Sequence, residues 1–389
     1  MSKLIHWSLL LLLLFACTAK EEKNVPPTIV VDLNQVPNAQ ETKALLNRMK
    51  IRFVPMENGD SIIYSGEDSR LCCFGDELYV VDAGQDVIFR YDKNGNFINK
   101  ISRQGEGPEE YIILGDFAIH EGSLFVKDRM KIQVYDLEGN YLRTIPVEVN
   151  GDIAFRADGS LIATANYLYP YQLTVYTPDG NKTWEALPSP EQLKSFKFGR
   201  KDRHTLGKVE LGDSYCFMNY FDPNIYILQD TTVRVLATLD FLKRSMPADY
   251  LNKPLEELAE SWSDDRMNDT YVFEVSDMVV TENWITFCPP LMKTKASVYY
   301  DRKAGKAITN LGFEGIYKML LGGYTCPDGY NPHTKEFYCL VNVSELQETL
   351  IELAERDPDY LIHYPFLEGI NPDALDEEAN DWAMFFTLD

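Results

Sequence analysis

One unit of strand-forming residues recurs along this 389-residue chain, and the repeat limits the fold more than any other feature. In its clearest copies, runs of Val, Ile, Phe and Tyr include Tyr91, Tyr135 and Tyr176, which lie 44 and 41 residues apart. Short apolar runs that alternate with polar residues are typical of β-strands. A period of about 40 to 45 residues is typical of four-stranded propeller blades. The repeat therefore predicts an all-β ring of stacked sheets.

Each clear copy also holds a tight turn between two strands. The turns are Asn94-Gly95, Glu138-Gly139 and Asp179-Gly180, and each glycine supplies the positive φ angle that a short hairpin needs. A small sheet of this kind cannot bury both of its faces alone. Neighbouring sheets that stack around a ring bury these faces together.

Three less regular copies follow, which makes six in all. They lie in residues 214–239, 284–311 and 316–341. The last copy lacks its outer strands locally, and we expect Trp382–Leu388 and Ile51–Pro55 to supply them from the two ends of the chain. Closure of this kind removes the exposed sheet edge on which chains aggregate. We therefore assign residues 51–389 to a six-bladed β-propeller closed by N- and C-terminal strands.

Two segments break the strand pattern and predict short helical insertions. Pro247–Trp262 lies between the fourth and fifth copies. Ser344–Arg356 places Leu346 and Leu350 on one face, and we expect Ser344 to cap this helix.

The start of the chain predicts export. Lys3 precedes an unbroken apolar run from Leu9 to Phe15, and Ala16-Cys17 follows. This is the positive, apolar and small-residue order of a secretory signal. The run is too short to span a bilayer as a permanent helix.

The Leu-x-Ala-Cys ending resembles a bacterial lipobox, in which the cysteine is lipidated. We assign residues 1–17 to a lipoprotein signal peptide and Cys17 to the lipid anchor. The alternative is an ordinary secreted protein cut near Ala16 or Ala19. Residues 18–50 then form a polar tether and the N-terminal segment that leads into the ring. We expect an outer-membrane lipoprotein of the cell envelope, either periplasmic or surface-exposed.

Several short segments carry a family resemblance. They are Arg103–Tyr111, the turns Tyr91–Gly95 and Tyr135–Gly139, and the N-terminal stretches Thr28–Leu33 and Phe53–Met56. In these segments the chain resembles the six-bladed β-propeller lipoproteins of Bacteroidota, which are distantly related to NHL-repeat proteins. The similarity covers nearly the whole mature chain and implies a six-bladed ring on a lipid anchor. The family has no established activity, so the resemblance implies fold and location rather than chemistry.

The charge balance narrows the class of partner. The chain has 37 Lys and Arg against 60 Asp and Glu, a formal net charge of −23. Binding to a phosphate backbone depends on Lys and Arg, so we expect no nucleic-acid partner. One basic cluster, Lys194–Lys208, either docks an anionic ligand or balances the acidic body.

The sequence contains no motif that identifies a catalytic centre. The histidines after the signal are not paired at metal-ligand spacing, and there is no H-E-x-x-H, G-x-S-x-G or Walker loop. Pro108 and a strand pattern follow Gly105-Glu106-Gly107 where a nucleotide-binding motif needs a helix. We predict no catalytic residue and no cofactor, although clustered carboxylates allow a structural calcium ion.

Six cysteines follow Cys17, and export would allow their oxidation. None has metal-ligand spacing. We expect Cys326 and Cys339 to face each other across a hairpin centred near Pro332. The remaining four lie mostly in apolar strand patterns typical of buried thiols: Cys72, Cys73, Cys216 and Cys288. The oxidation state of all six stays open.

Propeller geometry is the best guide to a ligand site. Loops from the outer strand of one blade to the inner strand of the next gather around one mouth of the channel, together with loops between second and third strands. Binding residues concentrate on such loops. Our ligand-binding candidates on this face are Asp82, Gln85, Arg103, Glu106, Tyr111, Asp128, Arg129, Lys131, Tyr167, Tyr169, Tyr171, Asp222, Asn224 and Lys293.

Each group of residues on this predicted face also has an explanation that involves no ligand. Gly105, Gly107 and Pro108 are also explained as residues that shape a blade junction, with Arg103 and Glu106 solvated. The tyrosines of residues 167–171 suit carbohydrate stacking, and they equally suit a loop that packs on its neighbour.

Three functions fit the sequence. The first is a non-catalytic module that binds a glycan, peptide or partner protein. The second is a glycan hydrolase or lyase, which two inward-facing carboxylates with a cation, or a bound metal, would favour. The third is a structural accessory of an outer-membrane uptake complex, which a flat apolar patch would favour. We prefer the first and expect a monomer anchored to a lipid membrane.

Overall fold

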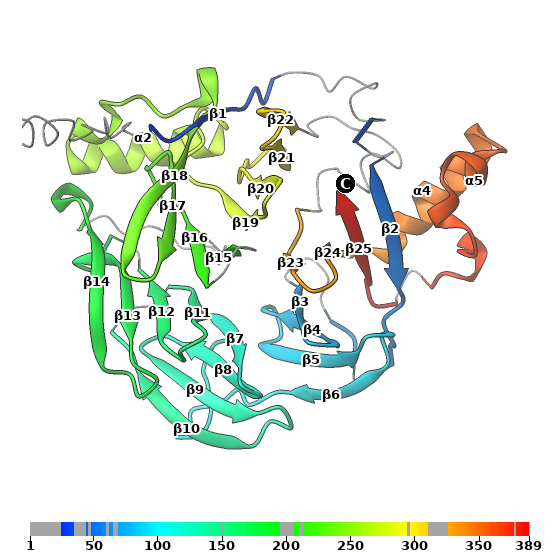
Figure 1. Ribbon diagram of the computed structural model, residues 1–389, viewed down its shortest axis with the longest axis horizontal. Coiled ribbons are helices and arrows are strands. Elements are labelled where there is room, and N and C mark those ends of the chain that lie inside the picture. The colour runs from blue at the N-terminus through cyan, green and yellow to red at the C-terminus, as the bar shows by residue number, and fades with distance from the viewer. Residues whose placement is uncertain are drawn as a thin grey trace, which may run out of the picture.

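The computed structural model describes residues 25–34, 44–45, 48–59, 62–64, 69–148, 151–165, 167–194, 206–209, 213–293, 296–309, 326–376 and 379–388. These residues form six small antiparallel sheets in a ring, which confirms the predicted six-bladed β-propeller (Figure 1). The signal segment with Cys17, most of the basic cluster and the strand expected near Ile316–Thr325 lie outside the described residues.

Each blade has four strands, and the first strand lies nearest the ring axis (Figure 1). Blades 1 to 3 consist of β3 (Ser69–Phe74), β4 (Glu77–Asp82), β5 (Val87–Asp92) and β6 (Phe97–Ile101); β7 (Asp116–His120), β8 (Ser123–Asp128), β9 (Lys131–Asp136) and β10 (Tyr141–Pro146); and β11 (Ile153–Phe155), β12 (Leu161–Thr164), β13 (Tyr171–Tyr176) and β14 (Lys182–Pro188). Blades 4 to 6 consist of β15 (Leu206–Val209), β16 (Ser214–Phe217), β17 (Asn224–Gln229) and β18 (Thr232–Asp240); β19 (Ser276–Val280), β20 (Trp284–Cys288), β21 (Val298–Asp301) and β22 (Lys306–Thr309); and β23 (Gly329–Asn331), β24 (Glu336–Val341), β25 (Trp382–Leu388) and β2 (Met49–Val54).

Strands from both ends of the chain close the ring, as predicted. β2 pairs with β25 along its whole length, and Phe53 lies opposite Met384. β25 pairs on its other side with β24. Figure 1 shows the N-terminal β2 beside the C-terminal β25. Blade 6 is therefore complete only when both ends of the chain are in place.

Two further pairings lie outside the predicted scheme. β1 (Thr28–Val30) runs parallel to β18 and adds a strand to the outer edge of blade 4. β15 and β19 meet through a parallel bridge between Val209 and Val280, which joins the inner ends of blades 4 and 5. Because β1 pairs with β18, part of the N-terminal segment belongs to the folded ring.

Successive side chains of a strand point to opposite faces of its blade and form the core between neighbouring blades. In β4, Leu78 and Val80 pack toward the aromatic residues of blade 6, and Tyr79 and Val81 pack toward blade 2. This is the two-residue period of a strand that is covered on both faces. The repeated tyrosines Tyr91, Tyr135 and Tyr176 are all buried.

The predicted turn glycines have the expected conformation. Gly95, Gly139 and Gly180 have φ angles of 83°, 84° and 86°. At Gly180 a Cβ atom would also lie 2.7 Å from the side chain of Ile145 in the preceding blade. Glycine there serves both the turn and the close contact between blades.

Helices lie in the loops between strands. They are α2 (Leu255–Met267), α4 (Val343–Arg356) and α5 (Tyr360–His363), with 3-10 turns η1 (Glu191–Leu193), η2 (Leu242–Arg244), η3 (Tyr250–Asn252), η4 (Pro365–Leu367) and η5 (Pro372–Ala374). The predicted cap of α4 is wrong. Asn342 is the cap, since its side chain accepts a hydrogen bond from the Glu345 amide at 3.0 Å. Among the described segments, no helix has both the length and the apolar character needed to cross a membrane.

One disulfide joins blades 5 and 6. It links Cys288, at the end of β20, to Cys326, which precedes β23. The prediction that Cys326 and Cys339 face each other is wrong. The paired residues of the β23–β24 hairpin begin at Gly329, so Cys326 lies outside the hairpin. Cys339 is buried in the core of blade 6. Cys72, Cys73, Cys216 and Cys339 are free thiols.

Candidate functional site

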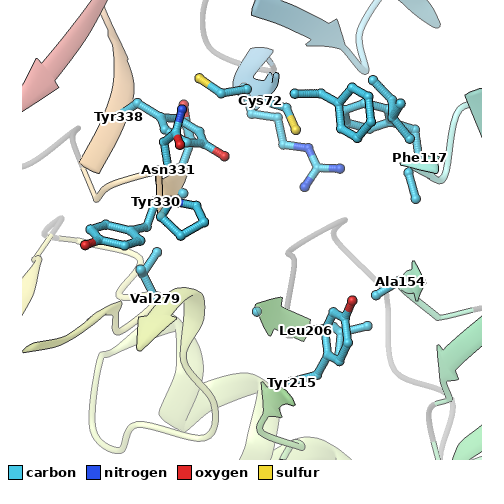
Figure 2. Close-up of a pocket in the computed structure, with 18 of the residues that line it drawn as sticks. Cys72, Phe117, Ala154, Leu206, Tyr215, Val279, Tyr330, Asn331 and Tyr338 are labelled. Atoms are coloured by element: carbon cyan, nitrogen blue, oxygen red, sulfur yellow. The ribbon is translucent and has the colours of Figure 1, made fainter. Parts of the chain in front are cut away.

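The first strands of all six blades enclose a cavity of about 400 Å³ on the ring axis. Figure 2 shows side chains from different blades around this space, among them Cys72, Phe117, Ala154, Val279 and Tyr330. None of the candidate residues predicted from the loops lines it. We call this space the channel cavity.

The channel cavity reaches the face opposite the predicted mouth. Its lining includes Phe74 and Gly75 from the hairpin between the first two strands of blade 1. It also includes Asn331, Pro332 and His333 from the equivalent hairpin of blade 6. Hairpins between first and second strands lie at the opposite ends of these strands from the loops that were predicted to bind the ligand.

An ion pair crosses the wall of the channel cavity. Arg70 of β3 donates from Nη2 to Asp116 Oδ1 of β7 at 2.6 Å. The guanidinium also lies 5.1 Å from the centre of the Phe117 ring. The second carboxylate oxygen of Asp116 accepts the backbone N–H of Ile153 at 2.7 Å. Asp116 therefore ties together the inner strands of three successive blades.

Two other aspartates repeat this inter-blade contact. Asp152 accepts the N–H of Leu206 in the next blade at 3.2 Å, and Asp328 accepts the N–H of Leu71 at 2.9 Å. In each pair a carboxylate near the start of one inner strand binds the inner strand of the following blade. Hydrogen bonds from N–H groups to an ionised carboxylate are stronger than neutral ones. An aspartate before a short apolar run is the sequence signal that could have identified these positions.

Two further carboxylates, those of Asp328 and Asp277, line the same cavity. Burial raises the pKa of Asp328 to about 7, and the nearby Asp277 carboxylate adds to the rise. The N–H groups of Leu71 and Leu340 act in the opposite direction. Asp277 accepts the hydroxyl of Ser276 at 2.8 Å. With Arg70, the channel cavity thus presents one cation and two acidic side chains that are not part of its ion pair.

Several of the predicted residues hydrogen-bond within the turns beside which they lie. Asp82 is fully buried and accepts both the backbone N–H and the side-chain amide of Gln85, at 2.9 and 2.7 Å. Asp222 accepts the backbone N–H of Asn224 at 2.9 Å. These carboxylates hold tight turns, a common role for aspartate.

The loop between blades 1 and 2 is held in the same way. Tyr111 is buried and donates to the Asp86 carbonyl at 2.6 Å. Asp128 is buried and pairs with Lys131 at 3.4 Å. Arg103 donates from Nε to a carbonyl oxygen of blade 2 at 2.9 Å.

In the aromatic loop of blade 3, some tyrosines are packed against neighbouring residues and others are exposed. Tyr167 is buried among Phe221 and Tyr250, and its hydroxyl donates to the Tyr220 carbonyl, as the packing alternative expects. Tyr169 is half-buried. The candidates that remain exposed are Gln85, Arg103, Glu106, Arg129, Tyr171 and Lys293. Their role in ligand binding stays a prediction.

Six blades, closure by both termini and a charged cavity on the axis define a six-bladed β-propeller with a central channel. The chain belongs to the family described as "Domain of unknown function (DUF4934)", whose model matches residues 28–387. No curated protein matches the sequence.

A solved structure shows the same fold. It is a Bacteroides fragilis protein that is described as exported, with a TM-score of 0.68 and 17% identity over 93% of this chain and 99% of that one. A DUF4221 family member from Bacteroides vulgatus has a TM-score of 0.49 and 10% identity, over 87% and 97% of the two chains. The Bacteroides fragilis match fits the predicted resemblance to a Bacteroidota family. The relation to NHL-repeat proteins stays a prediction.

Proposed function

We propose that this protein is a lipid-anchored binding module of the cell envelope that receives its ligand in the channel cavity. The observation that carries the proposal is a cavity of about 400 Å³ lined by the inner strands of every blade. Small-molecule sites are usually concave, with volumes of about 300 to 1,000 Å³ and a few charged groups among apolar walls. The channel cavity has this character.

The lining favours the end of a glycan or a peptide as the ligand. Phe74, Phe117 and Tyr330 provide flat apolar surface, while Arg70 and Asp277 provide charge. Aromatic faces cover the C–H faces of sugars or apolar side chains, and the charged groups select hydroxyl, amide or ammonium groups. An envelope protein would enter such a cavity only through an extended terminus or loop.

The location of the module follows from the N-terminal segment. Cys17 at the end of the signal is the proposed lipid anchor, and residues 18–50 contain the tether. The similarity to an exported Bacteroides protein supports export. Outer-membrane attachment is part of the same proposal.

The test begins with a glycan and peptide array probed with the soluble form that starts near Glu21. Ala154→Trp places a large side chain at the wall of the channel cavity, and we expect it to abolish binding of any neutral or cationic ligand found. Ala157→Trp is the matched control, because Ala157 is exposed in the following hairpin. Circular dichroism checks that both variants fold. Binding that survives Ala154→Trp but is lost in Tyr171→Ala would move the site to the face predicted from the sequence.

A glycan hydrolase or lyase is the second candidate function. Arg70, Asp277 and Asp328 line one cavity, and this is the arrangement of two carboxylates and a cation that favours catalysis. The pKa of about 7 would leave Asp328 partly protonated at neutral pH, as a general acid requires. Asp277 would then serve as base or nucleophile.

Incubating each array ligand with the protein separates the two functions. Release of new reducing ends by the wild type, and its loss in Asp328→Asn and Asp277→Asn with binding retained, supports catalysis. Binding without product release removes the enzyme and keeps the binding module.

A further inference from the structure

A second cavity, of about 410 Å³, lies between blades 3 and 4 and shares no lining residue with the channel cavity. Its walls come from the hairpin between β11 and β12, from β13 and the turn that follows, and from the start of β14. Thr231, between β17 and β18, completes the wall from blade 4. None of the ligand candidates predicted from the sequence lies in it.

A buried arginine is the main polar group of this second cavity. Arg156 is only 8% exposed. Its Nη2 donates to the Asp230 carbonyl, and its Nε is buried without a hydrogen-bond partner. Within the part of the chain that the structure describes, Nη1 makes no hydrogen bond and no carboxylate lies within ion-pair distance of the guanidinium. Asp158 in the same lining has a pKa that is lowered by hydrogen bonds from Ser160 and, to a smaller degree, by the charge of Arg156.

This arrangement calls for an anion. Burying a charged group without a counter-charge in direct contact is unfavourable, because its lost hydration is then only partly replaced. Arginine is always ionised in proteins, so it cannot escape the cost by losing a proton. A carboxylate in the cavity would accept a hydrogen bond from Nη1 and place a negative charge in direct contact with the guanidinium.

The other walls suit a hydroxylated ring. Trp184, which is half-buried, and Pro178 both line the cavity, so it has apolar surface for the C–H face of a ring. Thr177 and Ser160 bring hydroxyl groups. Asp158 is exposed at the rim, where its Oδ1 accepts the backbone N–H and the hydroxyl of Ser160. Its Oδ2 can accept a hydrogen bond from a sugar hydroxyl.

We propose that the second cavity binds an acidic sugar, a pyranose ring that carries a carboxylate. The carboxylate pairs with Arg156, the ring lies against Trp184, and the sugar hydroxyls meet the polar rim. The site is separate from the channel cavity and does not depend on what binds there.

Calorimetric titration of the soluble form with galacturonic and glucuronic acid, and with galactose and glucose, tests the proposal. We expect each acid to bind at least tenfold more tightly than its neutral parent sugar. Arg156→Met should remove this preference. Thr231→Glu should also weaken binding of the acids at least tenfold, because it adds a negative charge at an exposed position of the rim. Thr231→Gln is the matched control and should bind as the wild type does.

The Thr231 pair keeps the test decisive even if Arg156→Met fails to fold, since Thr231 is exposed and its replacement leaves the core unchanged. Equal affinity for acidic and neutral sugars would overturn the proposal. So would binding that Thr231→Glu leaves unchanged. Inorganic sulfate that binds as tightly as the uronic acids would overturn the assignment of a sugar ring to Trp184.

Discussion

Replacing Asp328 by asparagine should change how the stability of the ring depends on pH. Asp328 lies where blade 6 meets blade 1, and its Oδ2 accepts the N–H groups of Leu71 at 2.9 Å and Leu340 at 3.3 Å. An amide oxygen can accept the same two hydrogen bonds, so the substitution keeps the contacts and removes the titrating group.

The magnitude follows from the raised pKa. The pKa of Asp328 is about 7 in the folded chain, against an ordinary value of 3.8. Between these two values the folded state holds a proton that the unfolded state has lost, so the free energy of unfolding falls as pH rises. The loss is about 1.4 kcal/mol per pH unit, or about 4 kcal/mol over the whole interval. The loss of stability is complete above the pKa of the folded state and absent below the pKa of the unfolded state.

Urea unfolding followed by tryptophan fluorescence measures this effect between pH 4 and pH 8. We expect the free energy of unfolding of Asp328→Asn, relative to the wild type, to rise by up to about 4 kcal/mol across this range. Titration of all other groups cancels in the difference. Asp373→Asn is the control, because it makes the same chemical replacement at an exposed position. A constant difference for Asp328→Asn would show that this carboxyl ionises normally in the folded chain.

Three further outcomes test the fold. Reduction of the disulfide between Cys288 and Cys326, which are 38 residues apart, should lower the free energy of unfolding by about 4 kcal/mol. A Cys288→Ser, Cys326→Ser double variant should no longer respond to reductant. If the double variant responds as strongly as the wild type, the disulfide is wrongly assigned. Phe386→Ala, at a side chain that is 1% exposed in the closing strand β25, should cost about 3 to 5 kcal/mol in urea unfolding, whereas a cost below 1 kcal/mol would mean that β25 is not packed in the ring. Gly180→Ala should cost more than about 1 kcal/mol because φ is 86° and Ile145 is close, and a thermal melt unchanged from the wild type would contradict that turn.

The fold was predictable because its signals are local and repeated. Tyr91, Tyr135 and Tyr176 mark the same place in three blades, and each is followed by a turn glycine. The closing strand could be anticipated because one blade lacked partners and the two chain ends had strand patterns. Residues within a blade are close in sequence, so their periodicity reports directly on their pairing.

The candidate site was less predictable because its contacts join different blades. Asp116, Asp152 and Asp328 each bind the inner strand of the next blade, and nothing local identifies that partner. The ligand contacts were predicted on the loops, where Asp82 and Asp128 proved to be buried. A turn-forming aspartate and a ligand-binding aspartate look the same in sequence, and only their burial separates them.

The same contacts couple the channel cavity to the stability of the ring. Asp116 uses one oxygen for Arg70 in blade 1 and the other for Ile153 in blade 3. A ligand that draws Arg70 away leaves Asp116 with one partner fewer at a junction between blades. Its binding energy must then exceed the loss of a partly buried ion pair. Ligands that contact Arg70 without displacing Asp116, or that bind Asp277 on another wall, avoid that cost. The channel should therefore select cationic or neutral polar groups over simple anions, whereas the unpaired Arg156 should give the second cavity the opposite preference.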